Sequence, residues 1–139
     1  MNAAFEPVRT ELGSAQALVQ AQLEAYNAHD VEALLRCYHP QAQQFEYPDR
    51  LLAQGHEALR ERMTNRFRAS RPVATLLHRI VLGEVVIDYE QILNQSPDGP
   101  VVRELVAMYE VTRPGAQDPP AAVGTIVRAR FIFGEERRA

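Results

Sequence analysis

Apolar residues near the start of the chain recur with the spacing of an amphipathic helix. From Ser14 to Asp30, alanine, leucine and tyrosine return every three or four positions between glutamines and glutamates. This pattern predicts a helix of about four turns. Asp30 is typical of the N-cap of a second, shorter helix through Tyr38, which Pro40 cannot continue. We therefore expect two helices that meet at a tight corner.

A short strand and a third helix are predicted next. Residues 43–47 place two aromatic side chains before Pro48, which is typical of a strand with an abrupt end, and residues 51–54 are a candidate extension. Gly55 then opens a helical stripe of apolar residues that ends before Pro72.

After Pro72 the hydrophobic period changes to two, the period of β-strands. Gly83 leaves room only for a hairpin turn between the first two runs, and the proline-rich segment 113–121 predicts a loop. The predicted strands are residues 73–82, 84–93, 101–112 and 123–133.

This order of elements predicts an α+β domain in which three N-terminal helices pack on one face of a curved antiparallel sheet. The length suits one domain over residues 1–139, and the sequence contains no repeats or linkers. We expect residues 1–13 to form a loose N-terminal segment.

Neither face of the predicted strands is cleanly polar. In residues 84–93, Tyr89 shares one face with valine and isoleucine, whereas Asp88 and Glu90 share the other. We expect Tyr89 to point into the interior and both carboxylates to point away from it. A sheet that is half apolar on both faces must cover the second one, most simply with another copy of itself. We therefore expect a homodimer that packs through the convex face of the sheet.

The composition excludes several kinds of chemistry. All 15 residues counted as Lys plus Arg are arginine, which excludes Schiff-base catalysis and a P-loop lysine. Codon bias in a GC-rich bacterial genome would also produce this absence of lysine. The single cysteine, Cys37, excludes an internal disulfide and cysteine-rich zinc sites. The 4 histidines form no i, i+4 pair, so we expect neither a metal nor a cofactor.

Charge and hydropathy bear on the partners of the chain. The formal net charge of -3 argues against a nucleic-acid partner, because phosphate contacts require a basic patch. No apolar run approaches the roughly 18 residues that a membrane span needs. The first residues lack the basic and apolar regions of a signal peptide. We therefore expect a cytoplasmic protein without a membrane partner.

Five segments of the chain together resemble a known family. They are residues 26–30 (YNAHD), 45–48 (FEYP), 55–61 (GHEALRE), 79–84 (RIVLGE) and 130–135 (RFIFGE). With these segments in this order, the chain resembles the ketosteroid isomerase and SnoaL-like branch of the nuclear transport factor 2-like superfamily from about Val19 to Glu135. The resemblance implies an α+β cone with a deep apolar pocket, but such a fold does not by itself imply a function.

The resemblance also implies roles for individual residues. The isomerases of this family have a carboxylate base on the short strand and two oxyanion donors, a tyrosine and a protonated aspartic acid. The base corresponds to Glu46, the donors to Gln22 and Tyr109, and a pocket aromatic to Met63. Both donors are replaced, although each replacement can still donate a hydrogen bond. The epoxide hydrolases of the superfamily use an Asp-Arg-Asp relay, and Arg130 stands in place of one acid, which favours isomerisation.

Glu46, Tyr109 and His78 are the candidate catalytic residues. An apolar pocket would desolvate Glu46 and raise its proton affinity, whereas an exposed edge-strand glutamate is the alternative. Tyr109 could donate to an oxyanion or simply fill the core. His78, between Leu76 and Ile80 in a strand, could shuttle protons or be a core residue. The predicted ligand-binding residues are Gln22, Tyr26, Phe45, Tyr47, Met63, Tyr89 and Phe131.

Asp88 and Glu90 could present paired carboxylates from one strand face. Because we expect this face to point away from the pocket, Arg79 or Arg128 would pair with them at the dimer interface. Arg128 and Arg130 could instead close the pocket against an anionic ligand, since a guanidinium matches a carboxylate as a planar fork.

Three functions remain open from the sequence. The first is a cofactor-free isomerase or lyase that abstracts a proton from a small apolar carbonyl compound, with Glu46 as base and Tyr109 as donor. The second is a protein that binds a small molecule in the same pocket without turnover. The third is a dimeric interaction domain whose pocket is vestigial. The carboxylate at Glu46 favours the first function, and the loss of both family donors favours the second.

Overall fold

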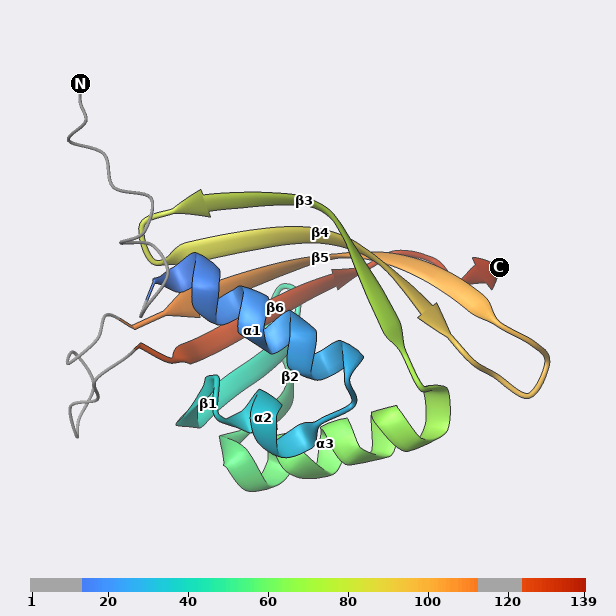
Figure 1. Cartoon of the computed structure of the whole chain (residues 1–139), viewed down its shortest axis with the longest axis horizontal. Coiled ribbons are helices and arrows are strands. Elements are labelled where there is room, and N and C mark those ends of the chain that lie inside the picture. Colours follow the sequence, from blue (N-terminus) through green and yellow to red (C-terminus); the bar gives the residue numbers. More distant parts are fainter. Residues whose placement is uncertain (1–13, 113–123) are drawn as a thin grey trace.

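The computed structural model describes residues 14–112 and 124–139, so the predictions for segment 1–13 and for loop 113–121 lie outside the described residues. The described elements are α1 (Ala15–Asn27), α2 (Val31–Leu35), β1 (Tyr38–Glu46), β2 (Arg50–Gln54), α3 (Gly55–Ser70), β3 (Val73–Leu82), β4 (Val85–Asn94), β5 (Val101–Val111), β6 (Ile126–Phe133) and β7 (Arg137–Arg138) (Figure 1). None of the helices in these two ranges is both long and apolar enough to cross a membrane.

The first two helices begin where the sequence predicts them, and Asp30 is the predicted N-cap of the second. The side chains of Ser14 and Asp30 each accept a hydrogen bond from a backbone N–H group three residues later, which satisfies donors that have no partner inside the helix. The second helix is shorter than predicted, because α2 ends at Leu35 and β1 begins at Tyr38. Pro40 therefore lies in a strand, where the pairing of β1 with β6 is interrupted and its missing N–H is tolerated.

The strands form one sheet in the order β2-β1-β6-β5-β4-β3, with β7 paired to β5. The expected sheet was wholly antiparallel, and this is wrong at one place, because β1 runs parallel to β6. A helix and several strands separate β1 from β6 in the chain, so no hairpin constrains their relative direction. All other paired strands are antiparallel.

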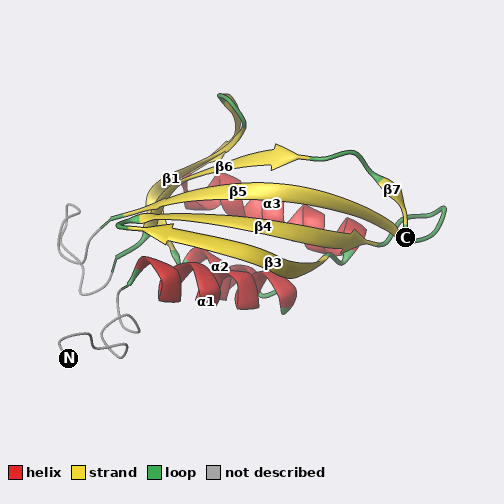
Figure 2. Ribbon diagram, turned by 90° about the horizontal axis from the view of Figure 1, so that it is seen from above, coloured by secondary structure: helices red, strands yellow, loops and turns green. Residues whose placement is uncertain are grey.

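The helices all cover one side of the curved sheet. Figures 1 and 2 show α1, α2 and α3 on the concave side, whereas no described helix covers the convex side. We call these sides the inner and outer faces. The core lies between the helices and the inner face, and its most deeply buried apolar residues include Val19, Leu34, Leu59, Val86 and Ile126. This arrangement confirms the predicted α+β class and the curved sheet.

The pairing of β4 with β5 determines which residues of β4 face inward. Val86 pairs with Tyr109, and both are buried on the inner face. Asp88 and Glu90 share this face with Val86, whereas Tyr89 points outward. The predicted orientation of β4 is therefore wrong, although the predicted alternation is right. The two-residue period sorts side chains into two faces but does not say which face the helices cover.

A β-bulge in β3 reverses the faces of its second half. The pairing of β3 with β4 shifts between Leu76 and His78, which leaves Leu77 as one extra residue. Beyond the bulge Arg79 points inward and pairs with Asp88, whereas His78 is exposed on the outer face. The prediction that His78 shares the inner face with Leu76 is therefore wrong.

Side-chain hydrogen bonds tie the end of α1 to β3. The Asn27 side chain donates to the carbonyl oxygen of Ala74 at 2.9 Å and accepts from its backbone N–H at 2.8 Å. The Nε2 atom of His29 lies 2.7 Å from the carbonyl oxygen of Pro72. These contacts substitute for the missing strand neighbour on this edge of the sheet.

We predict that Asn27→Ala destabilises the fold. The substitution leaves both polar backbone groups of the buried Ala74 without partners, which costs about 1–3 kcal/mol. Urea unfolding followed by circular dichroism would measure the loss. Asn65→Ala, at an exposed position of α3, is the matched control and should change stability by less than about 0.5 kcal/mol. Equal losses in the two variants would contradict the prediction.

Candidate functional site

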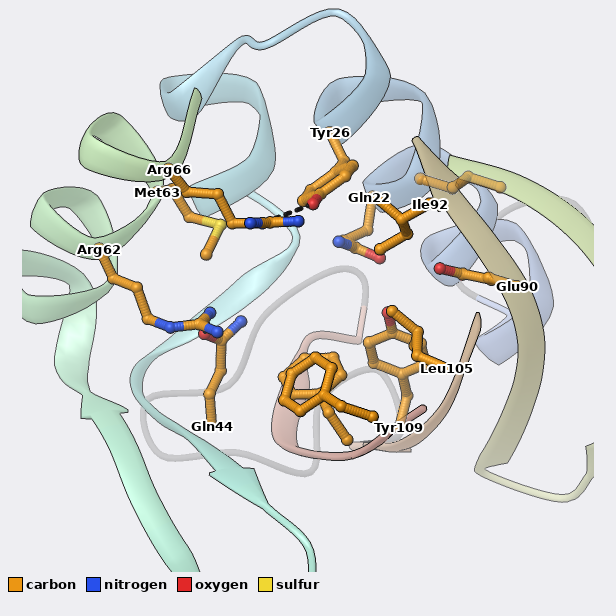
Figure 3. Close-up of a pocket in the computed structure, with 13 residues that line it drawn as sticks. Gln22, Tyr26, Gln44, Arg62, Met63, Arg66, Glu90, Ile92, Leu105 and Tyr109 are labelled. Carbon is orange, nitrogen blue, oxygen red and sulfur yellow. Dashed lines mark hydrogen bonds between the residues drawn. The ribbon is translucent and has the colours of Figure 1, made fainter. Parts of the chain in front are cut away.

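A cavity lies between α1, α3 and the inner face of the sheet (Figure 3). Its free volume is about 50 Å³, which is room for a few water molecules. The apolar lining consists of Leu23, Met63, Ile92, Leu105, Phe131 and Phe133. The polar lining consists of Gln22, Tyr26, Gln44, Arg62, Arg66, Glu90 and Tyr109.

Glu90 is the carboxyl group of this cavity. It stands on the inner face of β4 and is 5% exposed. Burial, and after it the neighbouring Asp88 carboxylate, raise the pKa of Glu90 from 4.5 to about 7, because both disfavour the charged form. Near neutral pH the carboxyl group can therefore both accept and donate a proton, as acid–base catalysis requires.

A buried ion pair lies next to Glu90. The fully buried Asp88 binds the Arg79 guanidinium through both carboxylate oxygens, at 2.6 Å to Nε and 2.9 Å to Nη2. Arg79 also donates to the side-chain oxygen of Gln20 at 3.0 Å. An unpaired buried charge would cost several kcal/mol, so this bidentate contact is what permits Asp88 inside the core. The predicted Arg79 partner is correct, but the pair lies inside the protein and not on the outer face.

Two hydrogen-bond donors face the cavity together with Glu90. Figure 3 shows the Tyr109 hydroxyl and the Gln22 amide pointing toward the same space as the Glu90 carboxyl. Burial raises the pKa of Tyr109 well above 10.0, so its hydroxyl keeps its proton at neutral pH. Neither group has a hydrogen-bond partner within residues 14–112 and 124–139. Both donors are therefore available to a ligand or a water molecule.

The opposite wall of the cavity carries two arginines from α3. Arg62 donates to the Gln44 side-chain oxygen at 2.6 Å. Arg66 donates to the Tyr26 hydroxyl at 2.8 Å and to the Asn94 side-chain oxygen at 2.9 Å. Burial lowers the pKa of Arg62, and the charge of Arg66 lowers it further. Since both arginines bind neutral acceptors, their positive charges are not cancelled by these contacts.

A wider, more polar hollow of about 410 Å³, which we call the vestibule, adjoins the cavity. It is lined by Glu46, Arg50, Leu52, Arg62, Arg66, Ile92, Asn94, Arg103, Leu105, Phe133 and Gly134. Glu46 is paired there with Arg50, and its side chain is 37% exposed. The structure therefore places Glu46 outside the apolar cavity, and the desolvation expected for a base at this position is absent.

The structure brings some predicted site residues together and separates others. Gln22, Tyr26, Met63, Tyr109 and Phe131 all line the cavity. The resemblance had singled out three of these, at the positions of two donors and one aromatic. Their ligand-binding and catalytic roles remain predictions.

Besides Glu46, four predicted site residues do not line the cavity. Tyr89 and His78 lie on the outer face, as described above. Tyr47, at the end of β1, is 50% exposed. Phe45 pairs with Arg130 on the outer face and lies 5.9 Å beneath its guanidinium. The predicted placement of Phe45 is wrong because alternation along β1 turns Gln44 inward and hence Phe45 outward.

The outer face also holds the two arginines that were considered, as an alternative, to close the pocket against an anionic ligand. Arg128 and Arg130 both bind the Glu110 carboxylate, at 3.1 Å and 2.6 Å. They belong to the face opposite the cavity, so they cannot close it. The expected pairing of Arg128 with Asp88 or Glu90 is likewise wrong, because antiparallel pairing sets Arg128 opposite Glu110.

Four polar residues of the cavity were missed as site residues: Glu90, Gln44, Arg62 and Arg66. The two arginines carried a signal in the sequence, because they lie on the apolar stripe of α3 beside Met63. Glu90 also carried a signal, as an acid inside a strand of apolar residues, but it was assigned to the wrong face.

The described residues offer no evident metal site. Within residues 14–112 and 124–139, no three His, Cys, Asp or Glu side chains converge as ligands. Cys37 is buried, and burial raises the pKa of its thiol, which disfavours the thiolate needed for a nucleophile or a metal ligand.

Known proteins share this fold. An epoxide hydrolase/cyclase-like enzyme with a role in pyran ring formation in the polyether salinomycin has a TM-score of 0.72 at 17% identity, covering 86% of this chain and 90% of its own. A putative SnoaL-like polyketide cyclase from Shewanella denitrificans has a TM-score of 0.71 at 12% identity, and the match covers 92% of this chain and 91% of the cyclase. A Mycobacterium tuberculosis protein in complex with estradiol-17beta-hemisuccinate has a TM-score of 0.68 at 16% identity, and the match covers 84% of this chain and 91% of that protein.

At such identities these likenesses concern the fold alone. No relative with a curated functional description matches the chain. The family comparison is more specific, because the SnoaL-like domain family matches residues 19–127, which include most of the cavity lining. The chain therefore belongs to the SnoaL-like domain family of the nuclear transport factor 2-like superfamily.

Proposed function

We propose that this protein is a cofactor-free enzyme that transfers a proton on a small carbonyl compound, with Glu90 as the acid–base group. The observation that carries the proposal is a buried carboxyl group with a pKa of about 7 facing a largely apolar cavity. Perturbed carboxyl groups in clefts are typical of catalytic sites.

The ionised form of Glu90 would accept a proton from the carbon next to the carbonyl group. The resulting acid form would return the proton to the same or another carbon, so the enzyme ends in its starting state. Both forms are populated near neutral pH, because the pKa of Glu90 is about 7. The largely apolar lining of the cavity would also limit loss of the proton to solvent.

Proton removal places negative charge on the carbonyl oxygen of the substrate. Tyr109 and Gln22 provide the donors for this charge, since both point into the cavity without competing partners among the described residues. Donors that are already oriented stabilise such a charge without reorganisation. Tyr109 suits this role because its raised pKa keeps the donor protonated.

The ion pair of Asp88 with Arg79 acts through Glu90 and has a positioning role. The Asp88 carboxylate raises the pKa of Glu90 by repulsion and by a shared hydrogen bond, and Arg79 partly offsets this effect. The proton affinity of Glu90 therefore depends on a buried ion pair that does not line the cavity.

Two solved neighbours support a small organic ligand. The salinomycin protein is described as an epoxide hydrolase/cyclase-like enzyme, and the Mycobacterium tuberculosis protein holds a steroid ester. The sequence had proposed Glu46 as the base, and the structure favours Glu90 because Glu46 is paired and partly exposed.

The second candidate function is binding of the same kind of ligand without turnover. The observation in its favour is that Glu90 borders a buried ion pair, and structural networks of this kind also perturb pKa values. The first test therefore has to separate turnover from binding.

We predict that Glu90→Gln abolishes proton transfer but not ligand binding. The probe is 2-tetralone in D₂O, whose exchange at the carbons next to the carbonyl is followed by proton NMR. The wild type should accelerate exchange over buffer, and Glu90→Gln should lower the accelerated rate by at least about 100-fold, the usual contribution of a general base. Titration calorimetry should give similar dissociation constants for both proteins.

Two further variants make this test specific. Glu46→Gln should keep the wild-type exchange rate, and so should Glu61→Gln, a control at an exposed position of α3. A loss in Glu46→Gln together with full activity in Glu90→Gln would move the base to Glu46. Binding of 2-tetralone without accelerated exchange in the wild type would establish the second candidate function instead.

We also predict a characteristic pH dependence of stability. The folded-state pKa of Glu90, about 7, exceeds its usual value of 4.5, so the folded state holds this proton more tightly. The contribution of Glu90 to stability is therefore fully present below the usual pKa and is lost as pH rises through the folded pKa. Relative to Glu90→Gln, the wild type should lose roughly 2 to 3 kcal/mol between pH 5 and pH 8 in urea unfolding. Parallel stability curves for the two proteins would refute the shift.

We further propose that the outer face packs against a second copy of the chain. Its exposed large apolar side chains include Ile80, Leu82, Val85, Tyr89 and Ile132. The charges of this face are already paired, because Glu110 binds Arg128 and Arg130 and the Tyr89 hydroxyl donates to Glu104. An apolar surface with internally paired charges is complementary to itself, as a twofold interface requires.

Ile80→Lys should therefore convert a dimer into a monomer. Ile80 is 53% exposed on β3, so the substitution places an unpaired charge in the proposed interface without touching the core. Size-exclusion chromatography with light scattering would give the mass. Ala69→Lys, at an exposed position of α3, adds the same charge elsewhere and should leave the mass unchanged. A monomeric wild type would rule out the dimer.

A further inference from the structure

Three arginines around the vestibule have no acidic partner in the described part of the chain. Arg62, Arg66 and Arg103 all line it, and none of them forms an ion pair within residues 14–112 and 124–139. We call these three residues the arginine cluster. Arginines are usually paired when they are partly buried, so three uncompensated guanidinium groups in one hollow call for an explanation.

Arg103 is the least satisfied member of the cluster. It lies on the inner face of β5 opposite Ile92, and its guanidinium is 5.4 Å from the centre of the Phe133 ring. Its Nε atom is buried and has no hydrogen-bond partner among the residues that the structure describes. Buried N–H groups nearly always have a partner, so this atom marks a place where an acceptor is missing.

The charges of the vestibule do not balance. Its only carboxylate among the described lining residues is Glu46, which Arg50 already binds. Glu90 lies across the cavity from Arg62 and Arg66 (Figure 3) and outside the vestibule. The vestibule is therefore positively charged next to apolar walls, where low polarisability strengthens the field of the charges.

The cavity and the vestibule adjoin each other. They share Arg62, Arg66, Ile92, Leu105 and Phe133 as lining residues. The cavity alone is small, with about 50 Å³ of free volume, whereas the vestibule has about 410 Å³. A ligand larger than a few atoms would therefore extend from the cavity past the arginines into the vestibule.

We propose that the arginine cluster binds an anionic oxygen group, a carboxylate or a phosphate ester, on a ligand whose apolar part enters the cavity. This inference rests on the proposed function only for the orientation of the ligand, with the reacting carbon toward Glu90 and the anion toward Arg103. Arginine suits this task because its planar fork matches both carboxylate and phosphate oxygens. The anion would also supply the acceptor that the Arg103 Nε atom lacks.

Three naphthalene compounds test the proposal: 2-naphthoate, 2-naphthyl phosphate and the neutral methyl 2-naphthoate. They share one apolar ring system and differ in the group that would meet the arginine cluster. The chain has no tryptophan, so naphthalene fluorescence reports binding directly. At low salt, at least one anion should bind about tenfold or more tightly than the ester, the scale of one charge-assisted hydrogen bond. Added salt should reduce this difference.

Arg103→Gln is the decisive variant. Arg103 donates no hydrogen bond to another described residue, so its replacement breaks no such contact. The variant should weaken binding of the preferred anion about tenfold and leave binding of the ester unchanged, because only the charged contact is lost. Arg103→Lys should recover part of the affinity. Arg60→Gln is the control. Arg60 is an exposed arginine of α3 that is paired with Glu32, so its replacement should leave every affinity unchanged.

The outcomes separate this inference from the proposed function. Equal affinities for anions and ester, or an equal loss of both in Arg103→Gln, would overturn it. One of the two anions should bind more tightly to the wild type and lose more affinity in Arg103→Gln. That anion identifies the bound group as a carboxylate or a phosphate. The same titrations in Glu90→Gln, which should keep the anion preference, show that the site holds even where proton transfer fails.

Discussion

The inner face of β4 carries two carboxyl groups into the core, and the protein can bury them because Arg79 reaches Asp88 from the neighbouring strand. That contact depends on one extra residue, Leu77, at the bulge of β3. With Leu76 opposite Glu90 and no bulge, His78 would stand opposite Asp88, and Arg79 would point outward. The bulge therefore supplies the cation that compensates Asp88 and leaves Glu90 as the carboxyl group with a raised pKa.

The cavity is electrically polarised as a consequence. Its sheet side presents the Glu90 carboxyl group, and its helix side presents the guanidinium groups of Arg62 and Arg66. Among the described residues, Glu90 forms no ion pair with either arginine. A ligand that satisfies both ends has only one favourable orientation, which is how a site with few polar contacts can be selective.

Much of the fold could be predicted from local patterns. Ser14 and Asp30 begin their helices as expected, and the hairpin at Gly83 follows from the spacing of two strands. The resemblance to a family placed Gln22, Met63 and Tyr109 in one cavity. The site itself could be predicted only in part, because Tyr89 and Glu90 exchange faces relative to the expectation. Because of that error, Glu90, the proposed acid–base group, was expected on the surface and not in the cavity.

The sequence by itself determined that Asp88 and Glu90 share one face of their strand and that Tyr89 takes the other, because alternation is a property of the extended backbone. Only the tertiary structure decided which of these faces the helices cover, since both are half apolar and either could be buried. It also decided, through one bulge, that an arginine and not a histidine meets the buried aspartate. Such choices depend on pairing between residues distant in the chain, where a shift of one position reverses every side chain that follows.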